Sequence, residues 1–370
     1  MKKIRVLIVD DSVVIRRLLT DILGQDPEIE VAGTAPNGRI ALAKLPQINP
    51  DLVTLDVEMP ELDGLETLRE LRKTYPKLPV IMFSTLTSRG AAETLDALAL
   101  GASDYVAKPA NVGSVAAGIQ SVREQLLPKI KSLCKQPADL PTLARVAPIG
   151  NRPPQFSATA GPRRFDALVV GSSTGGPQAL SKVLTALPAS FPVPIVVVQH
   201  MPPLFTQHLA NRLNQDCALQ VSEARAGDRL EPGRVLIAPG DFHVELSRRG
   251  TEVCAVLNQA PPENSCRPAV DVLFRSAASI YGVHALGVVL TGMGQDGLRG
   301  SQAIVQGGGA VVVQDQATSV VWGMPRAVAE AGIAQAVLPL PNIPQELLKL
   351  TSAGRPPVAG TSVAAAPNRC

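Results

Sequence analysis

The chain has 370 residues, which is enough for two domains with separate cores. A net charge of +3 and an aromatic content of 3 % do not suit a polyanion-binding or base-stacking surface, so we expect no nucleic-acid partner. Five cysteines without a CxxC pair indicate reduced thiols. Acids interrupt the apolar start MKKIRVLIVDD, which therefore does not fit a signal peptide, and no apolar run approaches the roughly 20 residues of a membrane span. We predict a cytoplasmic protein that is not inserted in a membrane.

The first part of the chain alternates strand and helix patterns. Helical spacing covers residues 13–23 and 62–75, and an amphipathic segment follows at 114–133. Continuous apolar runs, as buried parallel strands require, are found at residues 4–9, 51–57, 79–84 and 104–109. This alternation predicts a doubly wound, flavodoxin-like α/β domain over residues 3–125.

A change of composition separates this domain from a second one. Residues 126–163 are assigned to a linker, because 136–164 are rich in proline, alanine and arginine and show no period. Alternation of strands and helices then resumes, which predicts a second α/β domain with a parallel sheet over residues 164–350. Residues 351–370 are predicted to form a disordered tail.

Polar residues of the first domain follow the ends of its predicted strands. Asp10 and Asp11 follow the first strand, Asp56 ends the third, Ser84 ends the fourth, and Lys108 lies in the fifth. The carboxyl ends of parallel strands share one crevice, so these side chains are expected to converge. Three carboxylates together need a cation, and oxygen ligands suit Mg²⁺. A carboxylate in such a site can accept a phosphoryl group.

The motifs VDDS, LDVEMPELDG, FST and AKP resemble the receiver domain of two-component response regulators. The resemblance implies that Asp56 is the phosphoacceptor and that a sensor histidine kinase is the phosphodonor. It also implies that Mg²⁺ is held by Asp10, Asp11, Asp56 and the Glu58 backbone carbonyl. The switch residues that it implies are Ser84, Tyr105 and Lys108.

The stretch VVGSSTGGPQAL, residues 169–180, joins a predicted strand to a predicted helix through small residues. Its glycines fit neither a P-loop nor a dinucleotide fingerprint, which argues against nucleotide binding. They do fit the nucleophile elbow G-x-S-x-G, with Ser173 as the nucleophile in a strained turn. The pattern is short, and a simple glycine–serine turn is the alternative.

A serine nucleophile needs a base, and the chain has four histidines. His200 ends the apolar run at 194–199 and is expected at the same sheet edge as Ser173. The other histidines, His208, His243 and His284, are predicted to be structural or exposed. Asp296, after a glycine-rich turn, is the candidate partner of His200, and Asp241 is a competitor. The chain order Ser, His, Asp differs from that of α/β-hydrolases.

GSSTGGPQAL, QHMPP, APGDFHVEL, RPAVDVLF, LTGMGQDG and GMPRA resemble the catalytic domain of chemotaxis protein-glutamate methylesterases, the CheB family. The resemblance implies a Ser173–His200–Asp296 triad, with Thr174 and the Met293 backbone beside it, and no cofactor in this domain. Ser172 stands where the family often has alanine and is predicted to be filler. The implied substrates are glutamate γ-methyl esters and glutamines of chemoreceptors, at the cytoplasmic face of receptor arrays. The unphosphorylated receiver is expected to cover the esterase cleft.

Two other functions remain open at this stage. The second domain could be a binding module that only looks catalytically complete. It could also hydrolyse another ester or amide in a different signalling pathway. A transcription factor is not supported, because the second half lacks a helix-turn-helix pattern and a basic stripe.

Overall fold

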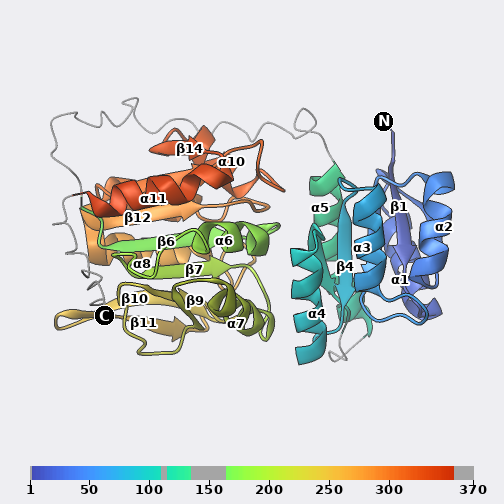
Figure 1. Cartoon of the computed structure of the whole chain (residues 1–370), viewed down its shortest axis with the longest axis horizontal. Helices are drawn as coiled ribbons and strands as arrows, with labels where there is room; N and C mark the ends of the chain where they lie inside the picture. Colours follow the sequence, from blue (N-terminus) through green and yellow to red (C-terminus); the bar gives the residue numbers. More distant parts are fainter. Residues whose placement is uncertain (1, 110–114, 135–163, 354–370) are drawn as a thin grey trace, which may run out of the picture.

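The computed structural model describes residues 2–109, 115–134 and 164–353. These residues form two α/β bodies, which lie side by side in Figure 1. Each body is built on its own parallel sheet, so the predicted fold class is confirmed for both.

The first body is the predicted receiver, with five parallel strands in the order β2-β1-β3-β4-β5. Its strands are β1 (Ile4–Val9), β2 (Ile29–Ala35), β3 (Leu52–Asp56), β4 (Val80–Ser84) and β5 (Asp104–Ala107). Its helices are α1 (Val13–Gly24), α2 (Gly38–Ile48), α3 (Gly64–Thr74), α4 (Ser88–Ala99) and α5 (Val115–Cys134).

Both faces of this sheet are buried. Leu7 and Val9 of β1 belong to the core that α2, α3 and α4 cover, whereas Val6 and Ile8 belong to the core beneath α1 and α5. Successive residues of a strand point to opposite faces, so burial on both sides explains the unbroken apolar run of β1.

Helix α5 continues through Cys134, beyond residue 125, where the receiver was predicted to end. The remainder of the predicted linker, 135–163, lies outside the described residues, as do residues 354–370 of the predicted tail. The first residues assigned to the tail, 351–353, belong to or follow the last helix instead.

The second body has seven parallel strands in the order β14-β13-β12-β6-β7-β9-β8, and β10 and β11 pair as an antiparallel hairpin. The strands are β6 (Ala167–Ser172), β7 (Ile195–Gln199), β8 (Gln220–Glu223), β9 (Arg234–Ile237), β10 (His243–Arg249), β11 (Glu252–Asn258), β12 (Ala285–Val289), β13 (Ala310–Gln314) and β14 (Ala336–Leu338). The helices are α6 (Gly176–Leu184), α7 (Phe205–Asp216), α8 (Val270–Tyr281), α9 (Leu298–Gln306), α10 (Met324–Glu330) and α11 (Ile343–Ser352).

The position of β6 in this sheet decides where a site can form. The strand pairs with β7 on one side and with β12 on the other. The connection that follows β6 runs to β7, while β12 is reached much later in the chain, so the strand order reverses at β6. Open α/β sheets bind ligands in the crevice outside the strand ends at such a reversal.

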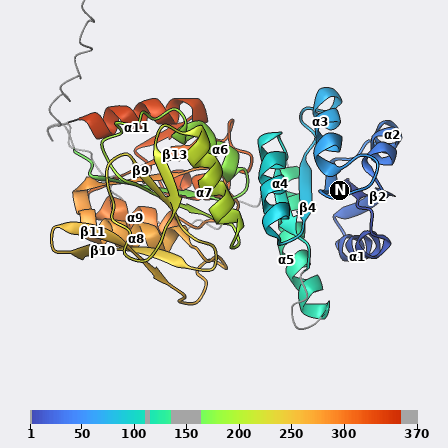
Figure 2. The same ribbon diagram turned by 60° about the horizontal axis from the view of Figure 1, so that its bottom comes forward.

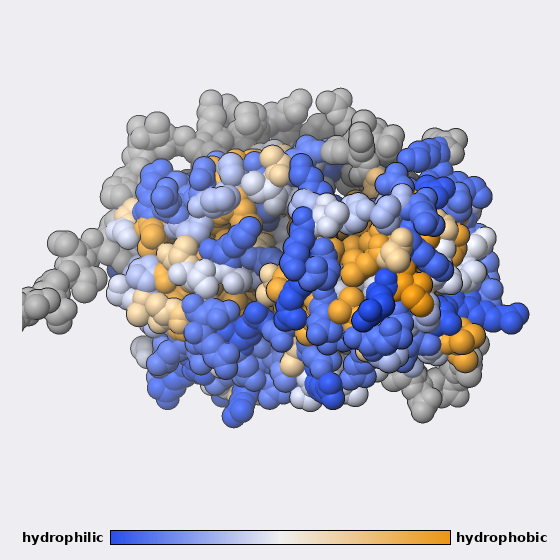
Figure 3. Space-filling model, turned by 45° about the vertical axis from the view of Figure 1, so that its right-hand side comes forward, coloured by the Kyte–Doolittle hydropathy of each residue, from blue (hydrophilic) through white to orange (hydrophobic). Residues whose placement is uncertain are grey.

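Helix α4 of the receiver packs against α6 and α7 of the second body (Figure 2). On the face drawn in Figure 3, hydrophilic side chains cover most of both bodies and apolar side chains form smaller groups. None of the helices in the described residues has the length and hydropathy that a membrane span needs.

Candidate active site and receiver pocket

The turn after β6 carries Ser173. The Ser173 N–H donates to Thr291 O at 3.0 Å, and the Gly176 N–H donates to Ser173 O at 2.7 Å, which closes the turn before α6. Gly175 has a φ of 75°, and a Cβ on it would lie 2.6 Å from the Val320 side chain, so only glycine fits. Ser173 itself has no positive φ, so the strain expected at the serine is absent and a glycine adopts the left-handed conformation instead.

His200 lies beside this turn because β6 and β7 end together. The last pair in their register is Ser172 with Gln199, and the His200 N–H donates to Ser172 O at 3.1 Å. Asp296 follows β12, on the other side of β6, and its Oδ2 lies 2.8 Å from His200 Nε2. The reversal at β6 therefore gathers Ser173, His200 and Asp296 from three strand ends, as the sequence predicted.

Both carboxylate oxygens of Asp296, which is 2 % exposed, accept hydrogen bonds. Besides His200, Oδ2 accepts from the Val270 N–H at 2.7 Å. Oδ1 accepts from the Asp271 N–H at 3.0 Å, the Gly297 N–H at 3.0 Å and Asn264 Nδ2 at 2.9 Å. Val270 and Asp271 are the first residues of α8, whose N-terminus favours negative charge. Asp296 is thus held ionised and fixed in orientation.

This environment shifts the pKa of both members of the pair. Burial alone would raise the pKa of Asp296, but His200 and the backbone donors of α8 outweigh it and hold that pKa below its usual value. Burial alone would lower the pKa of His200, but the hydrogen bonds to Asp296 and Cys266 outweigh it and raise that pKa. A base must be neutral to accept a proton, so catalysis by His200 is expected to increase with pH.

The second ring nitrogen of His200 contacts a thiol. Cys266 Sγ lies 3.5 Å from Nδ1, the nitrogen that Asp296 does not use. Among the described residues no hydrogen bond partner is found for Ser173 Oγ, so the imidazole faces Cys266 rather than the serine in this state. Ser173 is close to the base through its backbone, but its hydroxyl is not activated here.

Two backbone N–H groups beside Ser173 are available to an anionic oxygen. Neither the Thr174 N–H nor the Met293 N–H makes a hydrogen bond within the described part of the chain. The loop that carries Met293 is close, because a Cβ on Gly292 would lie 2.9 Å from Ser173 Cβ. The two residues expected beside the nucleophile are therefore found near it, with free donors of the kind an oxyanion hole uses.

The competing candidates lie elsewhere. Both ring nitrogens of His243 are engaged, one by the Ala269 N–H and the other by Pro261 O. His284 is half exposed near Arg164. Asp241 pairs with Arg267 and accepts from Gln259, so it does not face His200. His208 contacts Ser88 of the receiver, a role that the sequence did not indicate.

The acidic residues of the receiver converge as predicted. One carboxylate oxygen from each of Asp10, Asp11 and Asp56 lies within 4.8 Å of the others. Lys108 Nζ lies 3.1 Å from Asp10 Oδ2 and 2.7 Å from Asp56 Oδ2. Both of these oxygens are buried and accept no well-aligned hydrogen bond from the described residues. Lys108 supplies only one positive charge against three carboxylates, so the pocket keeps an excess of negative charge. Its donor atoms are all oxygens, which fits Mg²⁺.

The pKa of Asp56 is raised to about 6, because burial and the neighbouring charge of Asp10 outweigh the attraction of Lys108. The pocket therefore disfavours the ionised form of Asp56 beside Asp10 until a cation is bound. The Glu58 side chain is exposed and pairs with Arg89, so it would be the backbone of Glu58 that contributes if a metal binds in this pocket.

The three expected switch residues occupy different environments. Lys108 lies in the acidic pocket. Ser84, 1 % exposed, donates to Gly90 O in the first turn of α4 at 3.1 Å. Tyr105 turns away from the pocket, and its ring stacks on Phe205 of the second body at 4.8 Å. Ser84 and Tyr105 thus connect the pocket to the part of the receiver that contacts the second body.

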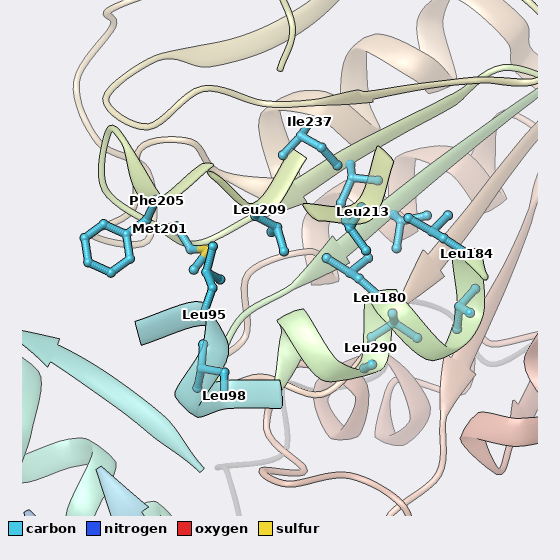
Figure 4. Packing of buried hydrophobic residues seen from close by; sticks show 14 of the residues in the cluster. Leu95, Leu98, Leu180, Leu184, Met201, Phe205, Leu209, Leu213, Ile237 and Leu290 are labelled. Atoms are coloured by element: carbon cyan, nitrogen blue, oxygen red, sulfur yellow. The ribbon is translucent and has the colours of Figure 1, made fainter. Parts of the chain in front are cut away.

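The contact between the bodies has an apolar centre. Figure 4 shows Leu95 and Leu98 of α4 beside Met201, Phe205 and Leu209 of the second body, and these residues belong to one continuous buried cluster.

Polar bonds surround this centre. Thr174 Oγ1 donates to Asp104 Oδ2 at 2.7 Å, and Lys129 Nζ lies 3.0 Å from the same oxygen. Gln178 Nε2 donates to the carbonyls of Leu98 and Ala102 at 2.9 and 2.8 Å. The residue next to Ser173 is therefore bonded directly to the receiver.

Comparisons with known proteins agree with this arrangement. Residues 168–347 match the family model for CheB methylesterase, and residues 6–120 match the model for the response regulator receiver domain. The chain belongs to the CheB methylesterase family. A protein-glutamate methylesterase/protein-glutamine glutaminase of Trichodesmium erythraeum is 54 % identical over 94 % of this chain and 99 % of its own length. One from a Nocardioides species is 56 % identical over 96 % of this chain and 98 % of its own.

Among solved structures, the CheB methylesterase catalytic domain of Thermotoga maritima shares 47 % identity with a TM-score of 0.50. The match covers 50 % of this chain and 98 % of the Thermotoga chain. The predicted enzyme class, a methylesterase joined to a receiver domain, is thereby confirmed.

Several residues near the site were not foreseen. Ser172, predicted to be filler, is fully buried and donates from Oγ to Gln199 Oε1 at 2.7 Å. Asn264 and Cys266 reach Asp296 and His200 from one loop before α8. No spacing or composition marks these residues, because their role depends on how a loop folds back over distant strand ends.

Proposed function

We propose that the chain is a phosphorylation-regulated hydrolase that demethylates glutamate γ-methyl esters, and deamidates glutamines, on chemoreceptors, giving adaptation in chemotaxis. The main support is the His200–Asp296 hydrogen bond of 2.8 Å beside Ser173 at the reversal of the strand order. Relatives more than 50 % identical carry names that state both activities. The enzyme acts in the cytoplasm, on the cytoplasmic face of receptor arrays.

In the proposed mechanism, Ser173 Oγ attacks the ester carbonyl while His200 accepts the serine proton. The Thr174 and Met293 N–H groups bind the oxygen that becomes negative. His200 then gives its proton to the leaving methoxide, which departs as methanol, and water hydrolyses the acyl-enzyme with His200 as base again. Asp296 orients the imidazole and stabilises its charged form. With glutamine the leaving group departs as ammonia.

The receiver pocket is proposed to take a phosphoryl group on Asp56 from a sensor histidine kinase. Asp10, Asp11, Asp56 and the Glu58 carbonyl would hold Mg²⁺, which supplies the positive charge that three carboxylates and a phosphoryl group require. Lys108 already contacts two of the carboxylates and is placed to pair with the added phosphoryl oxygens.

Inhibition by the unphosphorylated receiver follows from the contact between the bodies. Asp104 accepts a hydrogen bond from Thr174, the neighbour of the nucleophile, so the docked receiver lies beside Ser173, where a receptor helix would have to bind. Phosphorylation adds about −1.5 to −2 charge. If Ser84 moves toward the phosphoryl group, its bond to Gly90 O is lost and the first turn of α4 is released.

The test is methanol release from methylated receptor membranes, with and without Mg²⁺ and a small phosphodonor. Release that rises with the phosphodonor and disappears in Ser173→Ala supports both parts of the proposal. Release that ignores the phosphodonor contradicts regulation alone. Near-normal release by Ser173→Ala contradicts the nucleophile, and no release from folded native protein contradicts the substrate.

A further inference from the structure

We propose that Gln199 and Ser172 are positioning residues that hold the backbones of the nucleophile and the base at a fixed separation. This inference rests on the proposed function, because it takes Ser173 and His200 as the catalytic residues. Gln199 and Ser172 are buried, and their side chains bond to each other and to the backbones of Ser173 and His200, so they act through the two residues that follow them.

The Gln199 side chain uses its whole amide group for this purpose. The residue ends β7 and is 2 % exposed. Its Nε2 donates to the carbonyl of Ser173 at 2.9 Å and to the carbonyl of His200 at 3.2 Å. Its Oε1 accepts from Ser172 Oγ at 2.7 Å. A single planar amide is therefore bonded to the backbone of both residues that carry the chemistry.

The amide lies where the sheet stops fixing these residues. Ser172 and Gln199 form the last pair in the register of β6 and β7, so Ser173 and His200 lie just beyond it. The His200 N–H still bonds to Ser172 O, and past that point the Gln199 amide spans the two chains. These side-chain hydrogen bonds take the place of the next backbone hydrogen bond between the two strands. The carbonyls of Ser173 and His200 fix which way the amide faces, because a carbonyl can accept only from its nitrogen; the Ser172 hydroxyl then donates to the amide oxygen.

The surroundings leave the amide little freedom. A Cβ built on Gly176 would lie 1.9 Å from Gln199 Oε1 and 2.9 Å from Ser172 Cβ, so the first helical residue of α6 must be glycine for the amide to fit. A tightly held amide limits movement of Ser173 relative to His200. Such movement matters because a misplacement of about 1 Å is enough to lower an enzyme rate about 10²-fold.

The experiment measures methanol release by the full chain with Mg²⁺ and a phosphodonor, in Gln199→Leu, Gln199→Glu and Ser172→Ala. We expect Gln199→Leu to lower kcat about 10²-fold with KM within about threefold, and Ser172→Ala to lower it about tenfold. Gln199→Glu keeps the acceptor but loses the donors, so it should resemble Gln199→Leu. Ser172→Ala should add little in a Gln199→Leu background, because the two residues act as one unit.

Two further measurements separate positioning from stability. A fluorophosphonate reagent reports how readily Ser173 reacts, and its rate should fall in parallel with kcat while Tm changes little. Ser301→Ala is the matched control: Ser301 is fully buried in α9, its Oγ has no hydrogen-bond partner among the described residues, and kcat should stay native.

Native kcat and native reagent rates in Ser172→Ala and in the folded Gln199 variants would overturn the inference, whatever happens to Tm. If Gln199→Leu does not fold, Ser172→Ala decides alone. Full activity in Ser173→Ala would instead overturn the proposed function. An inactive Ser173→Ala beside native Gln199 and Ser172 variants overturns only the positioning role.

Discussion

The receiver pocket and the esterase site both hold buried carboxylates, but they treat the negative charge in opposite ways. Asp296 accepts hydrogen bonds on both oxygens from a histidine, a helix N-terminus and an amide. Asp10 and Asp56 each bury an oxygen that faces only Lys108 among the described cations. The pKa of Asp296 is lowered, whereas that of Asp56 is raised to about 6.

The difference fits the role that we propose for each site. A catalytic carboxylate that only orients a histidine works best when its charge is stabilised before substrate arrives. A regulatory carboxylate that binds a cation and then a phosphoryl group must leave part of its charge unsatisfied. The esterase site is therefore preorganised, whereas the receiver pocket keeps an excess of negative charge that a bound cation would neutralise.

The largest expected effect comes from removing the charge of Asp296, the carboxylate whose oxygens are both hydrogen-bonded. Asp296→Asn should lower kcat by about 10³- to 10⁴-fold, because the asparagine amide favours the wrong imidazole tautomer; the upper value is known from the corresponding change in another serine hydrolase. Initial rates of methanol release measure this. Asp241→Asn is the control, because Asp241 pairs with Arg267 instead of His200. Equal losses in both variants would contradict the assignment of Asp296.

Removing the charge of Asp56, whose buried oxygen faces only Lys108, should be favourable instead. Asp56→Asn should raise the free energy of unfolding of the receiver above pH 6 without Mg²⁺, by up to about 3 kcal/mol from the shift between 3.8 and about 6. A raised pKa means that the native state binds the proton more tightly. The contribution of Asp56 to stability is therefore full below pH 3.8, falls as the pH rises from 3.8 through about 6, and is lost above that. The variant should lack this fall.

Urea unfolding of the full chain, followed by far-UV circular dichroism, reports on both bodies, and the receiver transition is the part that the fluorescence of the second body does not share. Trp322, the only tryptophan, reports separately on the other body by its fluorescence. Millimolar Mg²⁺ should stabilise the native chain and not Asp56→Asn. A variant that is less stable than the native chain at pH 7.5 without Mg²⁺ would show that the Asp56 charge is already compensated.

A smaller effect is expected where the two regions meet. Asp104→Ala removes the buried acceptor of the Thr174 hydroxyl, and a hydrogen bond to a charged group contributes about 1.5–3 kcal/mol. Methanol release without a phosphodonor should therefore rise about tenfold. Arg212→Ala removes the more exposed pair with Asp96 and should change the rate less than about threefold. Equal basal rates in Asp104→Ala and the native chain would contradict the proposed covering of the site.

The sequence predicts the strand-end residues well for a physical reason. Parallel strands place their carboxyl ends together, so Asp10, Asp56 and His200 could be assigned to two crevices from their distance after apolar runs. The same reasoning left Asp296 and Asp241 as alternatives, and the family resemblance favoured Asp296. The resemblance to two families then suggested roles for them. The structure brings each group together where the strand pattern placed it.

The other contacts depend on features that no periodicity reports. Asn264 has a φ of 52° in a loop that folds back to Asp296, and the fold of an irregular loop is not written in hydrophobic spacing. The Gln199 amide acts through backbone carbonyls, which every residue has. The orientation of Tyr105 toward Phe205 depends on docking of two bodies, and a pattern within one domain does not encode it.

The smallest predicted effect tests how the preorganised site sets its working pH. Cys266 is one of the groups that raise the pKa of His200, so Cys266→Ala should lower that pKa. Neutral imidazole then becomes available at lower pH, and the acid limb of the kcat/KM profile should move down by up to about one pH unit. Cys217→Ala is the control, since Cys217 follows α7 and makes no hydrogen bond to His200. A limb that stays in place would mean that the thiol contact is incidental, and a limb that moves to higher pH would mean that Cys266 lowers the pKa of His200 instead.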